Sequence, residues 1–251
     1  MSSRDRVDTA DVAEHRPRAT GPRRVTVAAL FDWDGTLIDS RAALLTAWRE
    51  STSRVLGRSY PATLAEEDLV FTRPGGQIWP ALASDRNELD ALVASFQAAY
   101  EASAEGVRAF AGVPEMLQGL RSAGVSIAVV TSKARRRFES DAVRAGVARL
   151  IDVSICAEDA DATKPDPGPV LRALEQLGVA GPVATMIGDT PVDVAAGIGA
   201  GTRTVGVAWG HAGAAELLTA GAEVVVRDPG ELLAHLTADR RARHHVTRRA
   251  S

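Results

Sequence analysis

The chain has 251 residues, of which 45% are hydrophobic and 24% are charged, a composition typical of a folded protein with a sizeable core. No uninterrupted apolar run approaches the roughly 18 residues of a membrane span, and residues 1–24 lack the apolar segment of a secretory signal peptide. A transmembrane protein is therefore excluded, and we expect a cytoplasmic one. The single cysteine, Cys156, excludes an internal disulfide and a multi-cysteine zinc site.

The net charge of −3 is unevenly distributed along the chain. Residues 1–24 hold six arginines against four acids, and residues 237–251 hold five arginines against one acid, so the region between them is acidic. We interpret both ends as disordered basic tails, because neither shows apolar periodicity. The acidic body argues against nucleic acid or a membrane as a partner, and no pattern indicates an oligomeric state.

Short apolar runs of strand length recur after the first tail, with helical patterns between them. The predicted strands are 25–31, 125–130, 151–155, 183–187, 203–207 and 223–226. Glycines mark the ends of several intervening helices, as Gly178 does after a face that carries Leu171, Leu174 and Leu177. The alternation predicts an α/β protein with a doubly wound, Rossmann-like parallel sheet covered on both faces.

One connection is far longer than such a fold requires. About 90 residues separate the first two predicted strands, where a βαβ unit needs only about 30. Two helical patterns lie in this interval, one with Ser40 and the other with Asn87 as the expected cap. We therefore predict an inserted all-helical cap domain over 40–108, and an α/β core formed by 25–39 and 109–236.

The polar residues of interest follow the predicted strands, where a parallel sheet binds its ligands. They are Asp32, Asp34, Thr131, Ser132, Lys164, Asp189 and, one turn further on, Asp193. Pooled carboxylates repel one another unless a cation joins them, and hard oxygen ligands with few histidines favour Mg²⁺ over zinc. A Mg²⁺ site with nearby Lys and Thr donors suits a phosphate group.

These residues resemble the four ordered motifs of the haloacid dehalogenase superfamily, over about residues 25–234. The matching motifs are Asp32-Trp33-Asp34-Gly35-Thr36, Thr131, Lys164-Pro165, and Gly188-Asp189 with Asp193. The helical insert and the stretches 112–117 and 205–210 resemble the phosphoglycolate phosphatase-like branch. This resemblance implies Mg²⁺-dependent hydrolysis of a small phosphorylated metabolite, a phosphate monoester, through an aspartyl-phosphate.

The resemblance also implies which groups carry the reaction. Asp32 would be the nucleophile and a metal ligand. Asp34 would be the acid and base, and would lend the metal only its backbone carbonyl. Asp189 would complete the protein's metal ligands, and Asp193 would support that site or orient Lys164, although a structural role in the first turn of a helix is an alternative for Asp193.

Phosphate binding would then fall to hydroxyl and ammonium donors. Thr131, Ser132 and Lys164 are expected to hold the transferring phosphoryl group. In the insert, residues 72–79 interrupt the helical pattern and resemble, in position, a substrate-facing loop of the cap. Arg73, the one cation in that loop, would grip a second anionic group of the substrate, with a solvated surface turn as the equal alternative.

Several polar residues are interpreted as structural. Only two of the 29 basic residues are lysines, Lys133 and Lys164. We predict that Lys133 lies with Arg135, Arg136 and Arg137 on a solvated helix face, so that Lys133→Arg would be nearly silent. Asp39 and Ser40 are interpreted as hinge and helix cap, His211 as incidental, and Trp48 and Phe96 as cap core.

Single residues argue for or against other activities of the same superfamily. Asp34 argues against a dehalogenase, which needs no acid for its leaving group. The absence of lysine between residues 40 and 110 argues against a phosphonatase that forms a Schiff base in the cap. A phosphomutase shares every core motif and remains the nearest enzymatic alternative. A non-catalytic phosphate-ester-binding protein is the alternative from another class.

Overall fold

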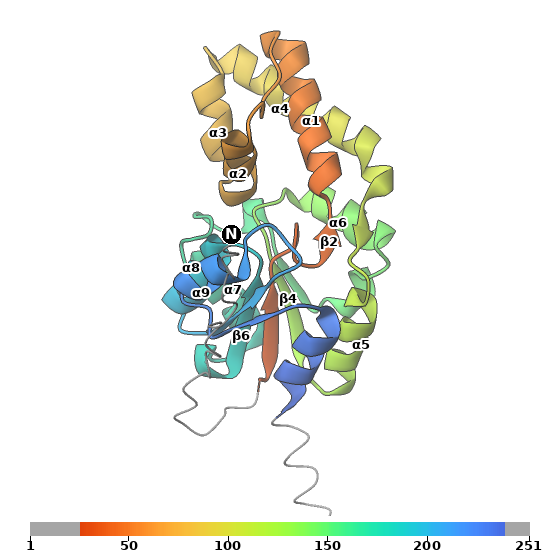
Figure 1. The fold of residues 1–251 in the computed structure, drawn as a ribbon, viewed down its shortest axis with the longest axis vertical. Helices are drawn as coiled ribbons and strands as arrows, with labels where there is room; N and C mark the ends of the chain where they lie inside the picture. The colour runs from red at the N-terminus through yellow and green to blue at the C-terminus, as the bar shows by residue number, and fades with distance from the viewer. Residues whose placement is uncertain (1–25, 239–251) are drawn as a thin grey trace, which may run out of the picture.

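The computed structural model describes residues 26–238, and its centre is one parallel sheet of six strands (Figure 1). Their order across the sheet is β5-β4-β1-β6-β7-β8. The strands are β1 (Ala28–Phe31), β4 (Ser126–Val130), β5 (Val153–Ile155), β6 (Ala184–Gly188), β7 (Arg203–Val207) and β8 (Val224–Val226). The predicted parallel α/β sheet is confirmed.

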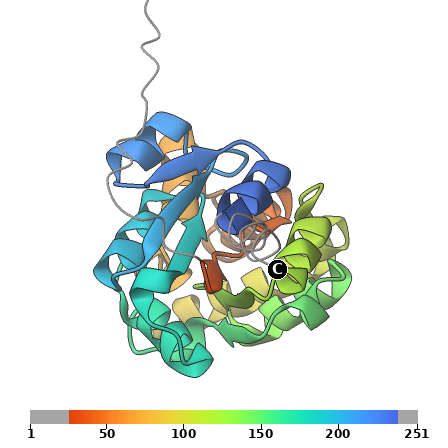
Figure 2. The same cartoon turned by 90° about the horizontal axis from the view of Figure 1, so that it is seen from below.

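Helices cover both faces of this sheet (Figure 2). They are α5 (Val113–Ser122), α6 (Arg135–Arg144), α7 (Gly168–Leu177), α8 (Pro191–Gly199), α9 (Ala214–Thr219) and a last helix over 229–238. Successive residues of β1 point to opposite faces, because side chains alternate along a strand. Ala29 and Phe31 pack into the core cluster that includes α5 and α6, while Ala28 and Leu30 pack into the cluster of α7 and α8.

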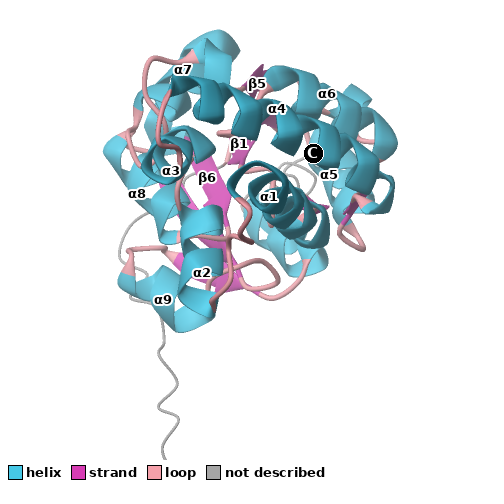
Figure 3. Ribbon diagram, turned by 90° about the horizontal axis from the view of Figure 1, so that it is seen from above, coloured by secondary structure: helices cyan, strands magenta, loops and turns pink. Residues whose placement is uncertain are grey.

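The long connection after β1 folds into four helices beyond the carboxyl edge of the sheet (Figures 1 and 3). These are α1 (Arg41–Leu56), α2 (Leu64–Thr72), α3 (Gly75–Leu82) and α4 (Arg86–Ser103), and α1 packs along α4. Their centre is aromatic: the Trp48 ring stacks on Trp79 with 3.5 Å between centroids and contacts Phe96 at 5.5 Å. The prediction that Trp48 and Phe96 form cap core is confirmed.

Short elements complete the chain trace. The antiparallel strands β2 (Ile38–Asp39) and β3 (Arg108–Ala109) pair where the chain enters and leaves the cap. Single 3₁₀ turns are η1 (Ala104–Gly106), η2 (Ala148–Leu150), η3 (Ala157–Asp159) and η4 (Gly181–Val183). Within residues 26–238, no helix has the length and apolar character that crossing a bilayer requires.

Several local predictions are wrong. Asp85, and not Asn87, caps α4, through a hydrogen bond that its side chain accepts from the Glu88 N–H at 2.9 Å. Leu171 is 48% exposed, so it lies off the buried face of α7. The predicted loop 72–79 shrinks to Arg73 and Pro74 between α2 and α3.

The predicted tails lie outside the described residues, except that residues 237 and 238 continue the last helix.

Candidate active site

The chain reverses its direction of travel across the sheet at β1, which has β4 on one side and β6 on the other. Such a reversal leaves a crevice at the carboxyl ends of the strands. A pocket of about 360 Å³ opens there, between the sheet edge and the cap. Its lining includes every residue that the sequence nominated: Asp32, Asp34, Arg73, Thr131, Ser132, Lys164, Asp189 and Asp193.

Three carboxylates meet at the floor of this pocket. Asp32, Asp189 and Asp193 each place an oxygen within 4.8 Å of the other two. Burial raises the pKa of Asp32 well above its ordinary value, against the attraction of Lys164. Burial, together with the charge of Asp193, raises the pKa of Asp189 to about 6. Burial is the largest cause of both shifts, and repulsion from the neighbouring carboxylates adds to it. A divalent cation would relieve that repulsion.

Lys164 supplies the positive charge that the cluster does have. Its Nζ donates to Asp32 Oδ1 and to Asp193 Oδ1, each at 2.6 Å, and the residue is only 4% exposed. Burial opposes the charged form, but Asp193 and Asp32 together raise the pKa of Lys164 above its ordinary value. The ammonium therefore stays charged beside Asp32.

Asp193 serves the helix and the site together. Its Oδ2 accepts from the N–H of Thr190 at 3.1 Å and from the Thr190 hydroxyl at 2.7 Å, in the capping box of α8. Its Oδ1 accepts from Lys164. The two roles considered from the sequence are thus compatible, because each uses a different oxygen.

Asp189 is held by donors from two turns. The Thr36 hydroxyl donates to its Oδ1 and the His211 N–H donates to its Oδ2, both at 2.8 Å. A side chain at Gly35, where φ is +86°, or at Gly210 would collide with this carboxylate. Both turns therefore approach Asp189 as closely as they do because they carry glycine.

His211 is not incidental. Besides its backbone contact with Asp189, its ring lies 3.0 Å from Arg41 Nη1 and 2.8 Å from Asp68 Oδ1. Arg41 begins α1 and Asp68 lies on α2, so this core loop contacts the cap directly. A lone histidine in a loop carried no signal of that contact in the sequence.

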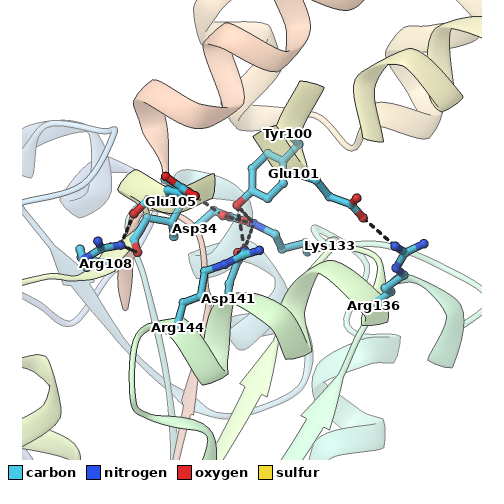
Figure 4. A network of polar contacts seen from close by, with 11 residues as sticks. Asp34, Tyr100, Glu101, Glu105, Arg108, Lys133, Arg136, Asp141 and Arg144 are labelled. Carbon is cyan, nitrogen blue, oxygen red and sulfur yellow. Dashed lines mark hydrogen bonds and ion pairs between the residues drawn. The ribbon is translucent and has the colours of Figure 1, made fainter. Parts of the chain in front are cut away.

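Asp34 is not a member of the carboxylate cluster, and Lys133 is among the residues that hold its side chain (Figure 4). Its Oδ1 accepts from the Ser40 hydroxyl at 2.5 Å and from Lys133 Nζ at 2.7 Å. Ser40 occupies the N-cap position just before α1, but its side chain makes no capping hydrogen bond, contrary to the prediction. The hydroxyl is instead committed to Asp34.

The prediction that Lys133 is solvated is wrong. Only 2% of its side chain is exposed, and it contacts Asp34, Tyr100 and Asp141. The physical reason is its position in the loop between β4 and α6, which turns the side chain back under the cap and not outward with the arginines of α6. Its rarity among 27 arginines was the one sequence signal that could have pointed to this role.

The three arginines of the α6 first turn also have different surroundings. Arg135 pairs with Asp159 and Arg136 pairs with Glu101. Arg137 lines the pocket with its guanidinium over the Phe96 ring, 4.9 Å from the centroid. Among residues 26–238, no carboxylate forms an ion pair with Arg137, and its buried Nε donates no hydrogen bond. Sequence reasoning missed this cation by grouping it with its neighbours.

Thr131 and Ser132 line the pocket at the end of β4. The Thr131 oxygen accepts from the Lys133 N–H at 3.1 Å, which leaves the hydroxyl proton available to a ligand. Arg73 lies at the cap side of the pocket and is exposed. Its placement is compatible with either of the two interpretations of this residue.

Comparison with known proteins agrees with this geometry. The model of the haloacid dehalogenase-like hydrolase family matches residues 29–207. The chain is 32% identical over 217 residues to the pyrophosphatase PpaX of Bacillus velezensis, covering 86% of this chain and 97% of that one.

Solved structures show the same fold. A hydrolase from Pseudomonas syringae superposes with a TM-score of 0.75 at 25% identity, covering 85% of this chain and 99% of that one. A protein from Lactobacillus plantarum, provisionally assigned as a phosphoglycolate phosphatase, gives a TM-score of 0.73 at 25% identity and covers 83% of this chain and 98% of that one.

Proposed function

The chain belongs to the haloacid dehalogenase-like hydrolases, and on this premise we propose that it hydrolyses a small-molecule phosphate monoester through a phosphorylated Asp32. The observation that carries the proposal is the meeting of Asp32, Asp34 and Lys164 at one pocket, where Asp32 belongs to a cluster of three carboxylates. The expected cytoplasmic location stays a prediction.

The donor set fits a magnesium ion. Asp32 and Asp189 would hold it through carboxylate oxygens and Asp34 through its backbone carbonyl, with Asp193 behind them. When bound, the ion would neutralise charge on the phosphate and on the carboxylates. The chain's own residues perform the remaining chemistry.

The first half of the reaction forms the phosphoenzyme. An Asp32 carboxylate oxygen attacks phosphorus as the bond from phosphorus to the leaving oxygen breaks. The leaving oxygen takes the proton of Asp34 and departs as an alcohol. Lys164 keeps Asp32 in place through its contact at 2.6 Å, and Thr131 donates to a phosphoryl oxygen.

The second half restores the enzyme. Asp34, now ionised, takes a proton from a water molecule whose oxygen attacks phosphorus, and the bond between phosphorus and Asp32 breaks. The products are inorganic phosphate, a free Asp32 carboxylate and a protonated Asp34. Each group therefore returns to its starting state.

Pyrophosphate is a second candidate substrate. The relative from Bacillus velezensis carries that activity in its name, and the unpaired Arg137 offers a cation for a further anionic group. A phosphomutase and a non-catalytic phosphate-ester-binding protein stay as alternatives, since both would use the same pocket.

A substrate panel tests the proposal. The purified protein is incubated with small phosphate monoesters, pyrophosphate and a hexose 1-phosphate, with Mg²⁺ or with a chelator, alongside Asp32→Asn. We expect Mg²⁺-dependent phosphate release that Asp32→Asn abolishes. Isomerisation of the sugar phosphate without release would establish the mutase, and binding without turnover of any substrate would establish the binding protein.

A further inference from the structure

The carboxylate of Asp34, the proposed acid and base, is connected to the cap through a cluster of four side chains that we call the hub (Figure 4). Lys133 lies at its centre and Asp34 at its active-site end. Asp141 comes from α6 in the core, while Tyr100 comes from α4 in the cap. Tyr100 is 1% exposed, and Asp141 is fully buried.

The Lys133 ammonium contacts three oxygen atoms of this hub. Nζ lies 2.7 Å from Asp34 Oδ1, 2.7 Å from the Tyr100 hydroxyl and 2.8 Å from Asp141 Oδ2. The ammonium donates hydrogen bonds to Asp34 and Tyr100 and forms an ion pair with Asp141. These three contacts hold the ammonium within the hub, although Lys133 also lines the pocket.

The direction of the remaining hydrogen bond is also determined. Burial, with the nearby charges of Asp34 and Asp141, raises the pKa of Tyr100 above its ordinary value, so the phenol keeps its proton. It donates that proton to Asp141 Oδ2 at 2.7 Å and accepts from Lys133. Arg144 contacts the other oxygen of Asp141 at 3.3 Å, so the buried Asp141 carboxylate is paired with both Lys133 and Arg144.

The hub leaves one oxygen of Asp34 for chemistry. Oδ1 accepts from both Lys133 and Ser40, whereas no residue among 26–238 donates to Oδ2. A carboxylate that is held by two donors on one oxygen has little rotational freedom, so Oδ2 has a set direction in the pocket.

We propose that Lys133 is a positioning residue that couples the seated cap to catalysis: Tyr100 and Asp141 hold its ammonium so that it fixes Asp34 with Oδ2 toward the substrate. This inference rests on the proposed function, because it presumes that Asp34 protonates the leaving group. When the cap lifts, Tyr100 leaves and Lys133 loses one acceptor, so the acid is fully aligned only in the closed enzyme.

The test compares two substrates that differ in their need for an acid. Nitrophenolate leaves without a proton from the enzyme, whereas the alkoxide of benzyl phosphate must be protonated. The readout is the ratio of kcat/KM for benzyl phosphate to kcat/KM for 4-nitrophenyl phosphate. A purely structural defect lowers both values together and leaves this ratio unchanged.

Two variants disturb the hub at different distances from the acid. Tyr100→Phe removes one hydroxyl from the cap side, and Lys133→Met removes the ammonium with little change in side-chain length. We expect the ratio to fall about 10- to 100-fold in Lys133→Met, the range that misplacing a catalytic group produces. Tyr100→Phe should give a smaller fall of about 3- to 10-fold, since one hydroxyl is lost and Lys133 stays.

Tyr60→Phe is the matched control. It makes the same chemical change in another buried tyrosine of the cap, which does not line the pocket, and should keep the wild-type ratio. If Lys133→Met does not fold, Tyr100→Phe decides alone.

Asp34→Asn separates this inference from the proposed function. A fall of the ratio in Asp34→Asn with a wild-type ratio in both Lys133→Met and Tyr100→Phe would overturn the coupling alone. An unchanged ratio in Asp34→Asn would overturn the acid role of Asp34, and the coupling with it.

Discussion

The carboxylate cluster predicts how the stability of the metal-free protein depends on pH. The pKa of Asp189 rises from 3.8 to about 6 on folding, first because of burial and then because of Asp193. The folded chain thus binds this proton more tightly than the unfolded chain does. Ionised Asp189 costs stability above about pH 6, and the cost is relieved as the pH falls from 6 toward 4.

The size of this change in the free energy of unfolding follows from the linkage between proton binding and folding. Between pH 7.5 and pH 5.0, protonation of Asp189 raises the free energy of unfolding by about 1 kcal/mol. This is only part of the full effect, because the gain continues until the pH falls to 3.8, where the unfolded chain also binds the proton. For a folded region of about 200 residues, this corresponds to a rise in Tm of about 2–4 °C. Bound Mg²⁺ would act in the opposite direction, since it favours the ionised carboxylate.

The assay is thermal unfolding in a chelator at both pH values, for the wild type and Asp189→Asn. Other groups titrate in this range, so the quantity of interest is the Tm of the wild type minus that of the variant. We expect this difference to shift by about 2–4 °C in favour of the wild type at pH 5.0. Adding Mg²⁺ at pH 7.5 should raise the Tm of the wild type more than that of the variant.

An exposed carboxylate provides the control. Asp90 lies on α4 with 61% of its side chain exposed, so Asp90→Asn should keep the pH dependence of the wild type. The reasoning is refuted if the Tm of Asp189→Asn changes with pH by the same amount as the Tm of the wild type. It is also refuted if Mg²⁺ raises both Tm values equally.

The remaining predictions concern activity. Asp32→Asn should lower kcat at least roughly a thousandfold with little change in Tm, because it removes the covalent nucleophile; near-normal turnover in a steady-state assay would contradict the mechanism. Lys164→Arg should lower kcat about 100-fold, since a planar guanidinium does not fit between two carboxylates that each lie 2.6 Å from the ammonium; an active variant would show that the compact ammonium is not needed. Arg137→Ala should lower kcat/KM for pyrophosphate about 10-fold more than for 4-nitrophenyl phosphate, the effect of one charge-assisted contact. Arg136→Ala is its control, because the paired, 82% exposed Arg136 lies outside the pocket, and an equal loss in both variants would remove Arg137 from substrate recognition. Arg73→Ala is measured with the same two substrates. A larger loss of kcat/KM for pyrophosphate would indicate that Arg73 grips a second anionic group, and equal values would indicate a solvated surface turn.

The sequence alone determined the sheet and the location of the site. Apolar runs of strand length alternate with helical patterns. Because any compact fold must bury these apolar residues, their periodicity predicts the elements without knowledge of the tertiary structure. Because parallel strands share one carboxyl edge, the residues that follow each run had to meet: Asp32, Thr131 and Asp189 do so. Lys164 was identifiable for a similar reason, since its loop follows a strand of the same edge.

Only the tertiary structure decided the environment of Asp34. Its partner Lys133 lies 99 residues away in sequence, and Tyr100 and Asp141 lie on helices of different domains. Periodicity shows which side of an element is apolar, but it does not show which polar side chains become buried when two elements dock. Lys133 and Arg137 were therefore placed on a solvated face by their neighbours in sequence, whereas the docking of the cap on the sheet edge encloses Lys133 and places Arg137 against aromatic rings.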